Sequence, residues 1–340
     1  MKILLISTGG TIASKPGEDG LAPVEQGEAL AAQVPGISEI ADIEIFNVFS
    51  KDSSNMHPDD WLAIIKALYL NREKFDGFII THGTDTMAYT SSALSFVLRD
   101  FDKPVILTGS MLPMSYEETD AKYNLENSFK FMRALLDRGQ NGVSICFAAK
   151  LIHGPRAKKI SAKKIDAFNS VFYDDLGRLE NGKAVIAKKP FIDRATLCSS
   201  SKNKSAVRFA NDIMPVKIFP GFRAHYFDRM VDLKPAAIVA ECFGLGGFPF
   251  MGENLLSGIK RATSLGILTV ITTQCPEGGV DLATYDVGQK SLKSGAVSGF
   301  DMGFEAIITK LMYLLPLMPA DQAGEMLSHN FCDEVGKVEI

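Results

Sequence analysis

Apolar residues in this chain gather into short, nearly continuous runs that are separated by polar and helix-like segments. The runs richest in β-branched residues span 2–7, 77–81, 104–108, 142–148, 236–240 and 266–272. Runs of this length and composition predict buried strands. Strands that are apolar throughout and alternate with helices are typical of parallel sheets covered on both faces. The pattern therefore predicts an α/β fold.

Three amphipathic stretches follow strands in the first half of the chain. Pro58 and the two acidic residues that follow it predict the first turn of one helix. Asp120 is the predicted cap of another. The apolar positions at helical spacing are expected to face the core. They are Trp61, Ile64, Ile65 and Leu68 in the first helix, Met87, Leu94, Val97 and Leu98 in the second, and Leu125, Phe129, Met132 and Leu136 in the third.

A length of 340 residues exceeds one ordinary core of about 100–200 residues and predicts two domains. A polar stretch over 197–211, rich in serine and lysine, interrupts the alternating pattern. We therefore expect an N-terminal α/β domain over 1–190, a linker over 191–212 and a C-terminal α/β domain over 213–340.

Composition and charge argue against a nucleic-acid-binding protein, a membrane protein and a protein held by disulfides or zinc. The chain has 36 basic and 40 acidic residues, a net charge of −4, and gives no electrostatic reason to expect a nucleic-acid partner. No apolar run approaches the roughly 18 residues of a membrane span, and the N-terminal run is too short for a secretory signal. The five cysteines are scattered and lack CxxC spacing, which favours reduced thiols and a cytoplasmic location over disulfides or zinc.

Polar residues concentrate where the predicted strands end, and open α/β sheets bind their ligands at strand ends. Segment 8–13 reads Thr-Gly-Gly-Thr-Ile-Ala, and its glycines let the backbone turn tightly beside a ligand. A nucleotide-binding loop is one alternative, but neither GxGxxG nor GxxxxGK[ST] fits these residues. A purely structural turn is the other alternative.

Two further polar clusters stand between strands and helices. Segment 81–86 reads Thr-His-Gly-Thr-Asp-Thr, and a helix cap at Thr84 or Asp85 would explain only one of its polar residues. Segment 52–55 reads Asp-Ser-Ser-Asn. Taken alone it is typical of a helix cap, although N–H groups at a helix start also suit a carboxylate ligand.

Missing motifs exclude several kinds of catalytic centre. The chain has no GxSxG elbow and no HExxH, and its five histidines show no metal-ligand spacing. We therefore expect neither a metal nor another cofactor. A hydrolase with a threonine nucleophile remains possible if a nearby lysine receives the hydroxyl proton. The basic stretch 156–159 is the candidate source of that lysine.

Segments 8–12 and 82–86 together resemble the two signature motifs of the L-asparaginase/glutaminase family. The resemblance covers most of the chain and looks most like the cytosolic type I branch of the bacterial enzymes. It continues through 52–56, 107–111, 159–168 and 272–275. It implies a larger N-terminal domain with a flavodoxin-like parallel sheet, a smaller C-terminal α/β domain, and a homo-oligomer that is a dimer or a tetramer.

The resemblance also implies catalytic roles. Thr11 is the nucleophile that attacks the side-chain amide of L-asparagine, giving L-aspartate and ammonia through an ester intermediate. Thr84, Asp85 and Lys159 form a second polar group that moves protons. Lys159 matches the family pattern better than Lys158 because of its spacing to the segment 166–168.

Substrate contacts follow from the same resemblance. Ser53, Ser54 and Asp85 hold the α-carboxylate and α-amino groups, and Thr108 lines the same pocket. Many family members carry a tyrosine in the loop after the first motif, but 15–25 contains none. Tyr116 and Tyr285 are the candidate replacements.

Three interpretations of the function stay open. The first is a cytoplasmic asparaginase acting on a small molecule. The second is a related amidase of the same fold, such as a glutaminase, a component of a transamidation complex or a lysophospholipase-like enzyme. The third is a non-catalytic regulator that binds an amino acid without hydrolysing it.

Overall fold

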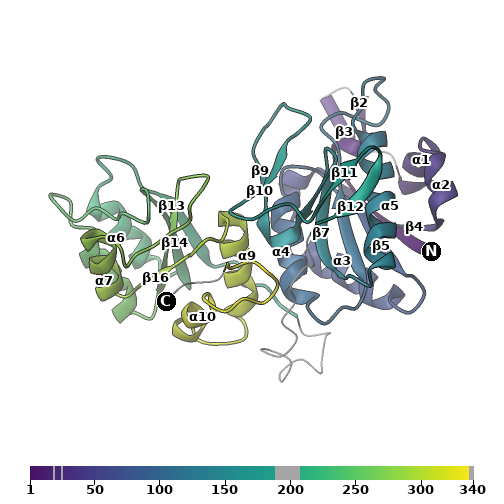
Figure 1. The fold of residues 1–340 in the computed structure, drawn as a ribbon. Coiled ribbons are helices and arrows are strands. Elements are labelled where there is room, and N and C mark those ends of the chain that lie inside the picture. Colours follow the sequence, from purple (N-terminus) through teal and green to yellow (C-terminus); the bar gives the residue numbers. More distant parts are fainter. Residues whose placement is uncertain (18–19, 24–25, 188–206, 337–340) are drawn as a thin grey trace. The chain divides into compact units, whose positions relative to one another are not determined.

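The protein is described from a computed structural model that covers residues 1–17, 20–23, 26–187 and 207–336 and consists of two compact units (Figure 1). The N-terminal unit comprises Met1–Lys204 with Phe331–Asp333, and the C-terminal unit comprises Ser205–Asn330 with Glu334–Ile340. The division falls inside the predicted linker, most of which lies outside the described residues. The predicted C-terminal domain is one continuous segment, whereas Phe331–Asp333 belong to the N-terminal unit.

Within the described residues, the main sheet of the N-terminal unit has the strand order β12-β11-β8-β7-β6-β5-β1-β4. The bounds are β1 Lys2–Gly9, β4 Asp42–Lys51, β5 Gly77–Thr81, β6 Pro104–Thr108, β7 Gly142–Phe147, β8 Lys150–His153, β11 Gly177–Glu180 and β12 Lys183–Ile186. The predicted strands of this half of the chain are confirmed, with differences of one or two residues at some of their ends.

The strands β1, β4, β5, β6 and β7 are parallel. Counted along the chain, these strands lie in the order 2-1-3-4-5, which is the flavodoxin-like arrangement. The expected fold class is therefore confirmed. The strand order reverses between β1 and β5, where Ile3–Ser7 pair with Gly77–Thr81.

The other strands of this sheet run antiparallel, which the expectation of a purely parallel sheet did not include. β8 pairs antiparallel with β7, and β11 with both β8 and β12. Ala148 and Ala149, with φ of 45° and 67°, reverse the chain between β7 and β8. A two-residue turn with positive φ at both positions makes a hairpin, so β8 returns beside β7 instead of crossing over a helix.

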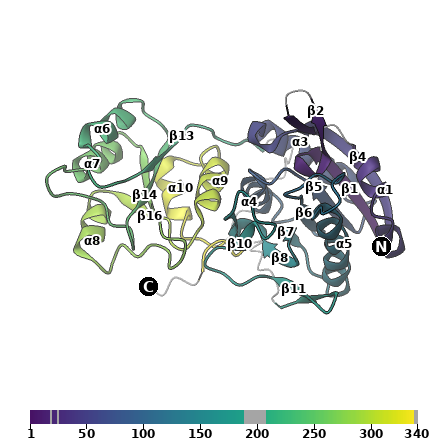
Figure 2. The same ribbon diagram turned by 90° about the horizontal axis from the view of Figure 1, so that it is seen from above.

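Helices cover both faces of this sheet. Their bounds are α1 Gly27–Ala32, α2 Gly36–Ile40, α3 Pro58–Asn71, α4 Met87–Val97 and α5 Ala121–Asp137. α1, α2 and α5 pack on one face, around Leu30, Ile37 and Phe129. In Figure 2 the strands β5 and β6 lie between α4 and α5. The predicted inward-facing residues are buried, except Val97 and Leu136, which are partly buried.

The C-terminal unit is a second, smaller α/β layer structure. Its sheet β13-β14-β15-β16 is parallel throughout. Helices α6 and α7 pack on one face and α9 on the other, as Figure 2 shows. The bounds are β13 Ile213–Lys217, β14 Ala237–Cys242, β15 Leu268–Thr273, β16 Ala296–Ser298, α6 Ala224–Asp232, α7 Leu256–Ser264, α8 Asp286–Lys293, α9 Phe304–Leu314 and α10 Ala320–Met326.

The segment 331–333 completes the N-terminal unit. Phe331 is fully buried, with the Arg99 guanidinium 5.2 Å from its ring centre. Arg156, also fully buried, donates from Nε to the Asp333 carbonyl oxygen at 2.7 Å. Among the described residues, no helix is both long enough and apolar enough to span a membrane.

Candidate active site

The two motif segments follow β1 and β5, the strands on either side of the position where the strand order reverses. Open α/β sheets bind their ligands at this position, beyond the carboxyl ends of the strands. The topology therefore brings together residues that are about 70 positions apart in the sequence. The Thr8 hydroxyl, for example, donates to the Thr81 carbonyl oxygen at 2.8 Å.

Glycines allow the segments to touch through their backbones. Gly10 has a φ of 81°, and a Cβ on it would lie 2.3 Å from both Cα and N of Gly83. A Cβ on Gly83 would lie 2.6 Å from the hydroxyl oxygen of Ser53. Since no side chain fits at either glycine, three segments meet in van der Waals contact at this point.

Thr11 begins a short 3-10 helix, η1 Thr11–Ala13, directly after this contact. The turn is fixed from both sides. The Gly10 N–H donates to the Lys51 carbonyl at 2.9 Å, and the Gly10 carbonyl accepts the Ser14 hydroxyl at 3.0 Å. Thr11 is half-buried, and within the described residues its hydroxyl has no hydrogen-bond partner.

Lys159 joins the second motif through its side chain. Its Nζ donates to the Thr84 hydroxyl oxygen at 2.8 Å and to an Asp85 carboxylate oxygen at 2.6 Å. Thr84 is buried, whereas the Asp85 side chain is 57% exposed. An ammonium shared between a hydroxyl and a partly solvated carboxylate is a suitable arrangement for moving a proton to or from a substrate.

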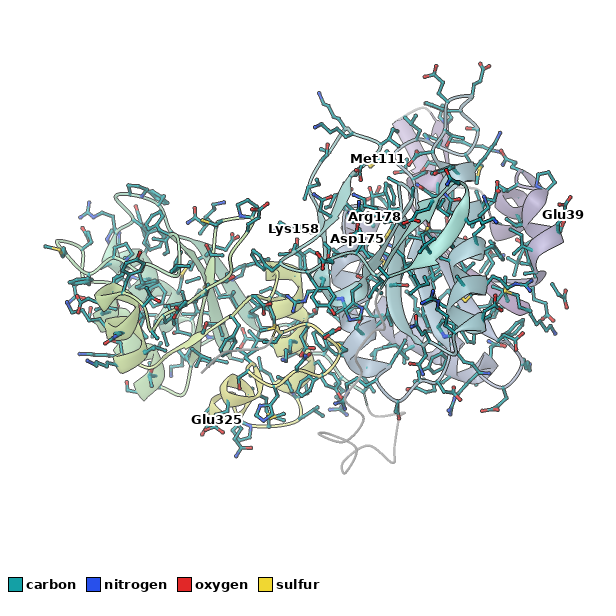
Figure 3. All side chains as sticks on the ribbon, viewed as in Figure 1. Glu39, Met111, Lys158, Asp175, Arg178 and Glu325 are labelled. Carbon is teal, nitrogen blue, oxygen red and sulfur yellow. The ribbon has the colours of Figure 1, made fainter. Side chains whose placement is uncertain are left out.

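A hairpin of β9 Ala157–Lys159 and β10 Phe168–Ser170 positions Lys159. Lys159 pairs with Phe168, whose fully buried ring lies 4.9 Å from that of Phe147. Lys158 lies on the same hairpin (Figure 3). Because successive side chains of a strand point to opposite faces, only one of the two adjacent lysines can face Thr84.

The helix-cap interpretation of the second motif is wrong. The residue at the N-cap of α4 is Thr86, and its side chain makes no capping bond to the helix. The Thr86 hydroxyl donates instead to the Ser53 carbonyl at 2.8 Å. Thr84 and Asp85 are therefore not needed for the start of the helix.

Segment 52–55 forms another short 3-10 helix, η2 Ser53–Asn55. The Asp52 carboxylate accepts the Ser54 N–H at 2.8 Å and caps this turn. Ser53 is buried beside Gly83, and Ser54 is exposed. The two serines thus differ in environment, and Ser53 is the one whose side chain lies against the motif contact.

Thr108 does not present its hydroxyl to the open site. The residue is fully buried, and its hydroxyl donates to the Cys146 carbonyl on the neighbouring strand at 2.9 Å. The Thr108 carbonyl accepts the His82 N–H at 2.8 Å. Thr108 therefore joins strand ends, and we exclude its hydroxyl from the proposed substrate contacts.

His82 has a structural environment that the motif alone did not reveal. Burial lowers its pKa to about 4, so the imidazole is neutral at pH 7. Trp61 Nε1 donates to the Thr90 hydroxyl oxygen at 3.0 Å, which directs the Thr90 proton toward His82 Nε2, also at 3.0 Å. His82 Nδ1 then carries the ring proton and donates to the Gly83 carbonyl at 2.7 Å. The histidine supports the loop and is sealed from any substrate.

The candidate tyrosines occupy different units. Tyr116 is 40% exposed in the segment between β6 and α5 of the N-terminal unit. Tyr285, 60% exposed, precedes α8 of the C-terminal unit. Among the described residues, no group of three or more histidine, cysteine or acidic side chains has an arrangement that could hold a metal ion.

Family models match both units of the chain. Residues 2–191 match the model described as "Asparaginase, N-terminal", and residues 212–322 match the "Glutaminase/Asparaginase C-terminal domain". A solved structure of the thermostable L-asparaginase from Thermococcus kodakarensis has a TM-score of 0.87 at 32% identity and covers 99% of each chain.

Curated relatives agree with the family models. The chain is 36% identical to an L-asparaginase of Thermococcus kodakarensis over 98% of this chain and 99% of the relative. It is 33% identical to L-asparaginase 1 of Escherichia coli K12 over 92% and 91% of the two chains. It is also 32% identical to one component of the glutamyl-tRNA(Gln) amidotransferase of Pyrococcus horikoshii, over 98% of this chain and 76% of that component. The chain therefore belongs to the asparaginase family of enzymes.

Proposed function

We propose that this enzyme hydrolyses L-asparagine to L-aspartate and ammonia, with Thr11 as the nucleophile. The observation that carries the proposal is the pair of contacts from Lys159 Nζ to Thr84 and Asp85. Thr84 directly follows Gly83 and Thr11 directly follows Gly10, and these two glycines are in backbone contact. A threonine hydroxyl acts as a nucleophile when a neighbouring group takes up its proton, and Lys159 is the candidate for that relay.

The first chemical step forms an ester. The Thr11 oxygen attacks the side-chain amide carbon, and its proton passes to the Thr84 hydroxyl, which gives its own proton to Lys159 as Lys159 gives one to the Asp85 carboxylate. The carbon–nitrogen bond then breaks, and Lys159 returns the proton to the departing nitrogen, which leaves as ammonia. Backbone N–H groups near Thr11 and Thr84 stabilise the oxyanion of the tetrahedral intermediate.

The second step restores the enzyme. Water attacks the β-aspartyl ester carbon, the bond to the Thr11 oxygen breaks, and the hydroxyl regains a proton through the same route. Ser53 and Ser54 bind the α-carboxylate, and Asp85 binds the α-ammonium, because ionised groups form the strongest hydrogen bonds. The exposure of Asp85 leaves its carboxylate accessible to a substrate.

Asparagine is the preferred substrate in this proposal because the named asparaginases match nearly the whole chain. Glutamine differs by one methylene, which changes binding by only about 1–3 kcal/mol. A glutaminase activity is therefore the main alternative and needs a direct comparison of the two substrates.

The proposed setting is the cytoplasm, with the enzyme as a homodimer or homotetramer. Among the described residues, Cys146, Cys242, Cys275 and Cys332 form no disulfides, which suits a reducing compartment. Light scattering of the purified protein distinguishes the two assemblies from a monomer.

The first test replaces Thr11 and Lys159 and measures ammonia release from asparagine and glutamine. Thr11→Ala and Lys159→Met are each expected to lower kcat on the order of 10³-fold or more, because each removes a group that acts in the chemical step. Lys158→Met is the matched control. It changes the adjacent lysine on the same hairpin, and asparagine turnover should stay near the wild-type rate.

Each alternative has its own outcome in this assay. Turnover that survives Thr11→Ala contradicts the assignment of the nucleophile. Faster hydrolysis of glutamine than of asparagine by the wild-type enzyme favours a glutaminase. Saturable binding of asparagine in calorimetry without any ammonia release favours the non-catalytic regulator.

A further inference from the structure

The segment 109–114, here called the β6 loop, contacts both motif segments. Gly109 has no room for a side chain, because a Cβ there would lie 2.3 Å from the carbonyl oxygen of His82. At the other end of the loop, the Met114 N–H donates to the carbonyl of Ile12 at 3.3 Å. The conformation of the β6 loop therefore affects the position of both motif segments.

Two buried polar side chains at the start of α5 hold the β6 loop. The Asp120 carboxylate accepts the N–H groups of Met111, at 3.0 and 3.1 Å, and of Leu112, at 3.0 Å. The Asn124 amide donates to the Gly109 carbonyl at 3.0 Å and to the Asp120 carboxylate at 3.0 Å. Asp120 is 6% exposed and Asn124 is fully buried. Met111 is marked in Figure 3.

The partners of Asn124 fix the orientation of its amide. Its nitrogen faces two acceptor oxygens, on Gly109 and Asp120, and its oxygen accepts the Ala148 N–H at 3.0 Å. A reversed amide would place an oxygen against two oxygens. A carboxylate of the same shape thus keeps the bond from Ala148 but loses both donated bonds.

This arrangement corrects the prediction that Asp120 caps α5. Asp120 does occupy the position before the helix, but its side chain makes no capping hydrogen bond. A cap would stabilise only the helix. The observed bonds cross to the β6 loop, and the Asn124–Asp120 bond links the two side chains one helical turn apart. Buried networks whose members are all satisfied make a local structure rigid.

We propose that Asp120 and Asn124 are positioning residues that hold the β6 loop in the conformation that binds the amino-acid substrate. This inference rests on the function proposed above. The β6 loop has no helix or strand of its own. Without these bonds it samples other conformations, and the apparent affinity for substrate falls with the fraction of enzyme in the competent one.

The test compares Asn124→Asp with Ser128→Ala in steady-state ammonia release from asparagine. Asn124→Asp keeps the side-chain shape but sets a second carboxylate against Asp120. Ser128 is the matched control, because it is buried on the same helix and bonds to the Asn124 backbone carbonyl at 2.8 Å. Asn124→Asp is expected to raise KM at least about five-fold, while Ser128→Ala leaves KM unchanged.

A change in KM distinguishes a positioning role from a simple loss of folded enzyme. Loss of folded enzyme lowers the apparent kcat without changing KM, since the remaining molecules bind normally. An Asn124→Asp enzyme that is folded by circular dichroism and has a KM within two-fold of wild type overturns the proposal. If Asn124→Asp does not fold, Asp120→Asn takes its place with the same expected rise in KM, because it retains an acceptor oxygen and loses the charge.

Failure of the proposed function gives a different result. A wild-type chain that releases no ammonia contradicts the hydrolysis itself. The positioning role is then tested by amide hydrogen exchange at Met111 and Leu112, whose N–H groups bond to Asp120. Exchange at least about ten-fold faster in Asn124→Asp than in Ser128→Ala supports the role, and equal exchange in the two overturns it.

Discussion

Gly10 shows at the residue scale how the site depends on the absence of a side chain. It has a left-handed backbone, with a φ of 81°, and backbone atoms of Gly83 occupy the space that a Cβ would take. Backbone atoms cannot swing aside as the end of a flexible side chain can. A methyl group at this position must therefore separate the two motif segments.

Gly10→Ala and Gly139→Ala distinguish this packing effect from backbone strain. Gly139 also has a positive φ, 61°, but a Cβ there meets nothing within 4 Å. Gly139→Ala carries a backbone strain of about 1–2 kcal/mol, and Gly10→Ala one of about 1–3 kcal/mol, because Gly10 also has a ψ of −178°. We expect Gly10→Ala to lose about 1–3 kcal/mol more from overpacking, together with most of its activity. Urea denaturation measures the difference, and equal losses in the two variants would refute the packing argument.

His82 predicts a pH dependence of stability. Its pKa is about 4 in the folded protein and about 6.5 when unfolded, so the unfolded chain binds more protons between these values. The free energy of unfolding therefore falls by about 3 kcal/mol as the pH drops from 6.5 to 4, with no further contribution outside that range. His82→Gln should show a shallower decline in urea denaturation over this interval. The same slope in both proteins would contradict the prediction.

The residues of the candidate site differ in how far they could be predicted. Thr84 and Asp85 stand out because a cap explains only one polar residue in their segment. Choosing Lys159 over Lys158 required the family spacing, since adjacent lysines look alike in a sequence. Asn124 gave no signal, because one polar residue on an amphipathic helix usually faces solvent.

At the scale of elements, apolar continuity predicted the parallel strands β1, β5, β6, β7, β14 and β15, because buried strands must be apolar on both faces. It did not predict the parallel edge strands β4 and β16, which are less buried. The antiparallel addition could not be predicted in the same way. Ala148 and Ala149 form the turn between β7 and β8 with positive φ, a conformation usually signalled by glycine or asparagine. The sequence therefore carries no turn signal at the place where the sheet changes direction.

A buried ion pair links α9 to the end of the chain in the C-terminal unit. Lys310 Nζ donates to Glu334 at 2.6 Å and to the carbonyls of Leu327, at 3.0 Å, and His329, at 2.6 Å. Both charged side chains are fully buried. Lys310→Met should cost about 3–5 kcal/mol in urea denaturation, because it leaves a buried carboxylate without its counter-ion.

A double variant tests whether the remaining charge causes that loss. Lys310→Met combined with Glu334→Leu removes both charges from the interior and should be more stable than Lys310→Met alone. A double variant that loses the sum of the two single effects would show that the residues act independently.

At the scale of the whole molecule, the length of the chain predicted two domains. It did not predict that the N-terminal unit would include a second, separate segment of the chain. The polar stretch marks where the chain leaves the N-terminal unit, yet nothing in the pattern shows that 331–333 return to it. Phe331 resembles any other buried aromatic residue in the sequence. Its place became visible only through its contact with Arg99 and the bond between Arg156 and Asp333.

This return has a consequence for biosynthesis. A ribosome makes the chain from its N-terminus, so the residues up to Lys204 emerge long before Phe331. At about 5–20 residues per second, the intervening stretch takes roughly 6–25 seconds to make. During that interval Phe331 has not yet been made and cannot pack beside Arg99. The bond from Arg156 to the Asp333 carbonyl cannot form either. The unit that carries the two motif segments is therefore completed only after Phe331–Asp333 have been made.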